Sequence, residues 1–187
     1  MPGRLGPARD EALAVLKEFA EDRAEMETAA FVLALSGDEA EAVKPADALA
    51  ARYPENTLLH ARGLAWIRAA TELARGRGQE AIDHLAASKP YDRGEITSHY
   101  LRGLAYLQLK SAPEALAAFQ AIIDRPQIDQ FLILHPLARL GKARAAALAG
   151  DFATARTAYQ DFLTWWKDAD PDLPVLVAAK AEYETIK

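Results

Sequence analysis

The residues of this sequence that could do metal or acid–base chemistry are four histidines, His60, His84, His99 and His135. A metal site on a helix needs two histidines three to five positions apart with a carboxylate nearby, as in His-Glu-x-x-His, because that spacing places both imidazoles on one face. No two of these histidines have that spacing. We therefore interpret them as ordinary histidines of helix surfaces or a groove, and we predict no metal and no cofactor.

The other chemistry-bearing groups give no enzyme motif. The acid pairs Glu39/Glu41 and Asp168/Asp170 are interpreted as solvated helix ends. The 187 residues include no cysteine, which excludes disulfides, thiolate zinc sites, iron–sulfur clusters and cysteine nucleophiles. Nucleophile-elbow and phosphate-loop signatures are absent as well. The sequence therefore favours a protein that is not an enzyme, with a histidine-based hydrolase or small-ligand carrier left open as an alternative.

The composition favours helices over strands. The chain has 41 alanines and 24 leucines, whereas valine and isoleucine together number 13. Alanine and leucine lose little on entering a helix, while β-branched side chains suit a pleated sheet. We therefore predict an all-α fold and exclude all-β and parallel α/β folds.

An internal repeat organises these helices. Four segments show the same order of an apolar helical pattern, a short break and a second helical pattern, with breaks at positions 37, 76, 110 and 150. One helix pair cannot bury its apolar face alone, so such units must stack. We predict a flexible lead-in at 1–7 and one domain over 8–187. Its parts are a leading helix over 10–20, four antiparallel helix pairs over 23–55, 56–89, 96–127 and 136–168, and a capping helix within 172–187.

Small residues recur where the two helices of each pair should approach closely. Larger residues such as Trp66, Phe119 and Tyr159 are expected to fill the space that remains. Gly37 and Gly150 suit the left-handed backbone that ends a helix, and Pro45 is expected to mark a kink or a helix start. The small residues are Ala30, Gly63, Gly103 and Ala143 on the first helices, and Ala42, Ala81, Ala115 and Ala155 on the second.

These residues resemble the tetratricopeptide repeat (TPR), a helix–turn–helix unit with a glycine followed by an aromatic residue and a terminal proline. Gly63 with Trp66, and Gly103 with Tyr106, match the glycine and the aromatic, and Pro54 matches the proline. The similarity covers about residues 23–165 and implies an α-α superhelix. The segment 158–183 further resembles the C-terminal TPR extension of acidobacterial-type serine/threonine protein kinases and related signalling proteins, although no kinase motif occurs here.

The resemblance also implies a partner-binding groove. In TPR proteins the first helix of each pair lines the concave face, and the positions beside the packing glycine face the groove. The alternative is that these faces pack against a neighbouring element or the cap. The carboxylate clamp of this family uses lysine and asparagine side chains from successive first helices. Such a clamp is disfavoured here, because the chain has a single asparagine, Asn56. The groove residues so implied are His60, Leu64, Arg68, Tyr100, Leu104, Gln108 and Arg144.

The charge distribution narrows the choice of partner. The net charge of −5 divides into −6 over residues 1–50, +4 over 51–150 and −3 over 151–187. Acidic flanks oppose nucleic-acid binding, whereas a basic middle suits an acidic or amphipathic protein or peptide. No apolar run approaches the roughly 20 residues of a membrane-spanning helix. We expect no membrane insertion and a cytoplasmic location, or an extracytoplasmic one if a parent protein carries a transmembrane segment.

Two functions other than catalysis follow from these features. The first is a non-enzymatic interaction or scaffold module that binds a protein or peptide segment in the groove. The second is self-association as a homodimer, through an exposed helix face or the Trp165–Trp166 pair. Phe162 and Trp166 share the apolar stripe of Tyr159, so Trp165 is predicted to point away from the core.

Overall fold

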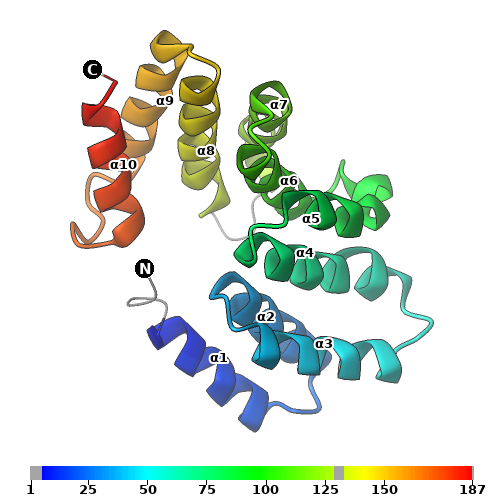
Figure 1. The fold of residues 1–187 in the computed structure, drawn as a ribbon. Coiled ribbons are helices and arrows are strands. Elements are labelled where there is room, and N and C mark those ends of the chain that lie inside the picture. Colours follow the sequence, from blue (N-terminus) through cyan, green and yellow to red (C-terminus); the bar gives the residue numbers. More distant parts are fainter. Residues whose placement is uncertain (1–5, 129–132, 187) are drawn as a thin grey trace. The chain divides into compact units, whose positions relative to one another are not determined.

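All regular elements of the computed structural model, which describes residues 6–128 and 133–186, are helices (Figure 1). The prediction of an all-α fold is confirmed. The helices of the described segments pack in consecutive pairs, which are α2 with α3, α4 with α5, α6 with α7 and α8 with α9. The chain divides into two compact units, one up to Tyr91 and the other from Asp92 onward.

Unit 1 contains a leading helix followed by two helix pairs. The leading helix packs against the first helix of the first pair. A π-helical stretch runs directly into α4, and a 3-10 stretch continues α5. The elements are α1 (Gly6–Glu18), α2 (Arg23–Leu35), α3 (Glu39–Arg52), η1 (Leu59–Gly63), α4 (Leu64–Ala74), α5 (Gly78–His84) and η2 (Leu85–Tyr91).

Unit 2 contains two helix pairs followed by a terminal helix. Successive helices pack against one another from α6 to α10. Two apolar clusters of buried residues hold this unit together, one centred on Phe119 and the other on Phe162. The elements are α6 (Thr97–Gln108), α7 (Ala112–Ile123), η3 (Pro126–Ile128), α8 (Leu134–Leu148), α9 (Phe152–Trp165) and α10 (Pro174–Glu184).

One turn geometry recurs at each of the four predicted breaks. The residue there has a left-handed backbone, with φ of 78° at Gly37, 74° at Gly76, 57° at Lys110 and 77° at Gly150. At each break this residue and the one after it donate backbone hydrogen bonds to carbonyls of the preceding helix, as Gly37 does to Ala34 and Asp38 to Leu33, both at 3.0 Å. These two hydrogen bonds satisfy carbonyl groups that have no partner within the helix at its C-terminal end. The predicted boundaries inside the helix pairs are therefore confirmed.

The eight small residues named from the repeat are all buried. In unit 2 the ring of Phe119 fills space beside two glycines, since a Cβ added at Gly103 would lie 2.6 Å from the ring and one at Gly141 would lie 2.4 Å from it. In unit 1 the corresponding space at Gly63 is occupied by the carboxyl group of Glu27, 2.3 Å from an added Cβ. Glycine thus serves close packing in both units, but its neighbour is aromatic in one and acidic in the other.

Two local predictions differ from the structure. The first helix begins at Gly6, so Gly6 and Pro7 are helical rather than part of a flexible lead-in, while residues 1–5 lie outside the described segments. Proline suits the first turn, where its missing N–H would have no helical partner. Pro45 neither starts nor interrupts a helix, because α3 runs continuously through it with the Pro45 ring buried.

Candidate functional site

The groove residues predicted in unit 1 are not equally accessible. His60 Nε2 lies 3.0 Å from the carbonyl oxygen of Tyr53, and Arg68 is exposed beside a cavity of about 80 Å³. Leu64 is completely buried, so its prediction as a groove residue is wrong. A π-helical stretch ends directly before this residue, at Gly63.

Two predicted groove residues of unit 2 are largely taken up by packing. The ring of Tyr100 lies edge-on to Phe119, with 6.1 Å between ring centroids. Leu104 packs against the same buried cluster. Burial raises the pKa of the Tyr100 hydroxyl, and the nearby Arg144 charge opposes that rise only in part. Gln108, at the end of α6, is exposed.

Arg144, the last predicted groove residue, is bound by the chain itself. Its Nε and Nη2 atoms each donate to a carboxylate oxygen of Glu182 on α10, both at 2.9 Å. The Tyr159 hydroxyl donates to the same carboxylate at 2.8 Å. Burial alone would raise the pKa of Glu182, but the hydrogen bonds from Arg144 and Tyr159 outweigh it and lower the pKa. The last helix therefore occupies the position at which a partner was expected.

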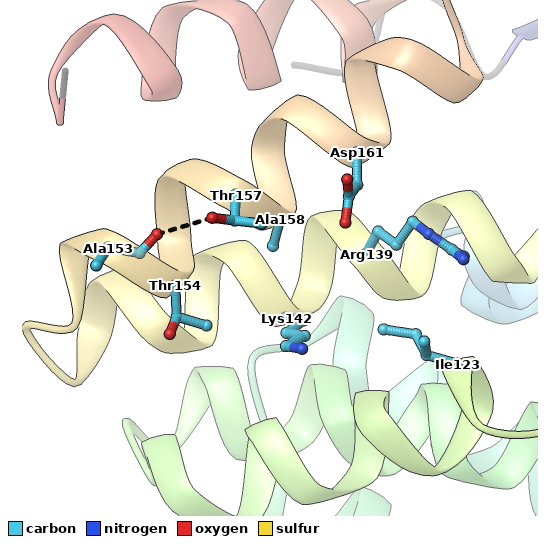
Figure 2. A pocket seen from close by; sticks show the side chains of 8 residues that line it. All are labelled: Ile123, Arg139, Lys142, Ala153, Thr154, Thr157, Ala158 and Asp161. Carbon is cyan, nitrogen blue, oxygen red and sulfur yellow. Dashed lines mark hydrogen bonds between the residues drawn. The ribbon is translucent and has the colours of Figure 1, made fainter.

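An open groove of about 440 Å³ lies elsewhere in unit 2, where α8 is flanked by the end of α7 and one side of α9 (Figure 2). Its lining combines two cations, one carboxylate, two threonines and small apolar side chains. The residues are Ile123 on α7, Arg139 and Lys142 on α8, and Ala153, Thr154, Thr157, Ala158 and Asp161 on α9.

Helical spacing brings the two cations to this groove. Arg139 and Lys142 are three positions apart and share one side of α8, whereas Arg144 lies on another side. The Arg139 side chain is held by two contacts, a 3.1 Å hydrogen bond from Nη1 to the carbonyl oxygen of His135 and a stacking contact 4.5 Å from the centroid of the Trp165 ring. Within the described segments, neither Arg139 nor Lys142 forms an ion pair.

The second wall of the groove is a continuous stripe of α9. The Asp151 side chain accepts a 3.0 Å hydrogen bond from the Thr154 N–H and so caps the start of this helix. The Thr157 hydroxyl donates to the Ala153 carbonyl at 3.2 Å, the dashed line in Figure 2. Trp165 lies one helical turn beyond the last lining residue, Asp161, and is 58% exposed. The prediction that Trp165 points away from the core is confirmed, since Phe162 and Tyr159 on the same helix are buried.

The potentially metal-ligating side chains of the described segments do not gather at one place. The histidines are dispersed, and no group of three or more potential metal-ligating side chains occurs among the residues that the structure describes. His99 Nε2, for example, lies 3.2 Å from the backbone carbonyl of Asp92 rather than beside a reactive side chain. A cationic groove with an exposed indole nearby can hold a polar segment of another molecule.

Sequence reasoning missed this groove because it considered one face of each first helix and left out the second helices α7 and α9. The signal was available in α8, which carries Arg139, Lys142 and Arg144 and no acid, and in the spacing of α9 residues that leads to Trp165.

Comparison of the chain with protein-family models, with curated proteins and with solved structures finds no match. Across residues 6–128 and 133–186, the helices are too short or too polar to cross a membrane.

Proposed function

We propose that this chain is a non-enzymatic interaction module of the tetratricopeptide-repeat type that binds a protein or peptide segment. The observation that supports this function best is the 440 Å³ groove of unit 2, which is lined by two cations without an ion pair within the described segments. One of them, Arg139, stacks on the exposed ring of Trp165. Arginine and tryptophan are the residues that most often dominate the free energy of protein association.

The repeated architecture supports the same proposal. Four turns with one geometry, at Gly37, Gly76, Lys110 and Gly150, separate the helices of successive pairs. Stacked helix pairs expose extended surfaces to partners, which is the common use of such repeats. The resemblance to kinase-linked repeats adds the proposal that the module belongs to a larger signalling protein.

Site-specific photo-crosslinking in cells tests whether the groove binds a protein. The photoreactive residue p-benzoylphenylalanine replaces Thr157 in the groove or, as a control, Lys180 on the exposed side of α10. We expect a crosslinked protein at position 157 that is absent at position 180. Equal crosslinking at both positions, or none at position 157, contradicts the proposal.

Self-association is the second candidate, and the exposure of Trp165 favours it. An exposed indole is an effective anchor for an identical subunit, because it buries a large apolar area without leaving a charge unpaired. Sedimentation equilibrium of the purified chain over a wide concentration range checks this function. A dimer that becomes a monomer in Trp165→Ala supports self-association, whereas a monomer at high concentration excludes it.

A further inference from the structure

We infer that the groove between α7 and α9 binds an acidic peptide segment, with Lys142 and Arg139 holding its carboxylates and Trp165 packing against an apolar residue beside them. The inference rests on the proposed function and specifies the chemistry of the partner. The groove residues belong to positions other than those implied by the repeat resemblance.

The charges of α8 are the first reason for an acidic partner. This helix carries one lysine and two arginines but no acid, and among the described residues a carboxylate pairs with only one of these cations, Arg144, through Glu182. Arg139 and Lys142 lie on the other side of the helix, are half-buried and form no ion pair within the described segments. A partly desolvated cation gains free energy from a carboxylate that reaches it.

The contact between Arg144 and Glu182 shows how this unit holds a carboxylate. There, a guanidinium donates two hydrogen bonds and the Tyr159 hydroxyl donates a third. The groove offers cationic donors in Arg139 and Lys142. Charge-assisted hydrogen bonds of this type are about twice as strong as neutral ones and depend on geometry, which gives selectivity over the uncharged amide.

The length of the groove and its one acid limit what fits. The α9 residues that line the groove end at Asp161, and Trp165 lies one helical turn beyond them. From Thr154 to Trp165 this side of α9 rises about 16 Å, which matches roughly five residues of an extended peptide. Asp161 lies in the wall between these ends and repels a second run of negative charge. The groove therefore suits one or two carboxylates near Lys142 followed by an apolar side chain near Trp165. It does not suit a uniform polyanion such as nucleic acid.

Fluorescence anisotropy with synthetic probes tests this specificity on the full chain. The probe is a fluorescein-labelled peptide, Glu-Glu-Ser-Leu-Phe, and the matched control is Gln-Gln-Ser-Leu-Phe. We expect the acidic probe to bind at least tenfold more tightly, and its affinity to fall as salt is added. Equal affinities for the two peptides, or tighter binding of a labelled oligothymidine that displaces the acidic probe, overturn the inference.

Charge variants locate the site. Lys142→Glu is expected to weaken binding of the acidic probe at least tenfold and to favour a Lys-Lys-Ser-Leu-Phe peptide instead. Lys180→Glu makes the same charge change on an exposed side of α10 and is expected to leave the affinity unchanged. Lys142→Gln removes the charge without reversing it and is measured in parallel. Circular dichroism verifies that each variant is folded. Equal weakening by Lys142→Glu and Lys180→Glu contradicts the groove assignment.

The result separates this inference from the function on which it rests. A protein crosslinked at position 157, together with no preference for the acidic probe even at millimolar protein, leaves the interaction module standing and overturns the acidic specificity. No crosslinked protein and no probe binding contradict both. Crosslinking of a second copy of this chain at position 157 overturns the inference in favour of self-association.

Discussion

At the scale of single residues, the strongest constraint is the space around Phe119. The ring is completely buried and lies against the backbone of α6 at Gly103 and of α8 at Gly141. Any side chain at these two positions would overlap the ring. Three helices of unit 2 can therefore approach one another only because two glycines flank one phenylalanine.

The variant Gly141→Ala tests this packing. Its Cβ would lie 2.4 Å from the Phe119 ring, so we expect the free energy of unfolding to fall by about 1–3 kcal/mol. Gly6→Ala is the matched control, because a Cβ at Gly6 meets nothing within 4 Å. Urea denaturation followed by circular dichroism measures both variants. Equal stability of Gly141→Ala and the unmodified chain would show that the ring moves aside freely.

Lys110 is the one described non-glycine residue with a positive φ, and it occupies the third repeated turn. A left-handed backbone costs an L-residue roughly 1–2 kcal/mol. Glycine avoids this cost, but it loses more conformational entropy on folding, which offsets part of the gain. We expect Lys110→Gly to raise the free energy of unfolding by about 0.5–1 kcal/mol. Lys44→Gly, inside α3, should instead lower it by about 1 kcal/mol. Thermal and urea unfolding check both signs, and a loss in Lys110→Gly would contradict the argument.

At the scale of elements, local rules explain where helices end better than how they continue. The repeated turns follow from residues that tolerate a left-handed backbone, and the sequence pattern located each one. The π-helical stretch before Leu64 and the uninterrupted helix through Pro45 were not predicted. Both depend on packing of neighbouring helices, which can override a local preference.

The attachment of α10 by Arg144 and Glu182 is testable by variants. Both side chains are about one-third exposed, so we expect Arg144→Met to lower the free energy of unfolding by only about 1 kcal/mol. The double variant Arg144→Met/Glu182→Leu should recover part of this loss, because no half-buried carboxylate is then left without its partner. A double-mutant cycle in urea measures the coupling. Additive losses would contradict it.

The same contact predicts a pH dependence. Because the pKa of Glu182 is lowered in the folded chain, its stabilising effect is present at neutral pH and is lost as the pH falls through the folded-state pKa. The stability difference between the unmodified chain and Arg144→Met should therefore shrink on acidification. Urea titrations from neutral to strongly acidic pH follow it, and a difference that is constant with pH would exclude the carboxylate as its source.

At the scale of the whole molecule, the chain forms two compact units of similar size, whereas the sequence suggested one continuous repeat domain. The boundary lies at Tyr91 and Asp92, between the second and third helix pairs. Periodicity alone does not show such a division, because the repeat pattern continues on both sides of it. The density of contacts within each part becomes evident only from the fold.

Unit 2 is expected to fold without the preceding residues. It holds two apolar clusters of its own, around Phe119 and Phe162. A fragment of residues 92–187 should unfold cooperatively in urea. A control fragment of residues 133–187 lacks Phe119 and should not. Non-cooperative unfolding of the longer fragment would mean that its clusters are insufficient.

The sequence by itself determined the fold class, the positions of the repeated turns and the burial of the small packing residues. These features depend on helix propensity, apolar periodicity and backbone freedom at residues such as Gly37 and Gly150, all of which act locally. Only the tertiary structure decided which charges meet. Arg144 and Glu182 are 38 positions apart, and the groove of Lys142 forms where α7, α8 and α9 come together. Such contacts arise from distant elements, which spacing along one helix does not specify.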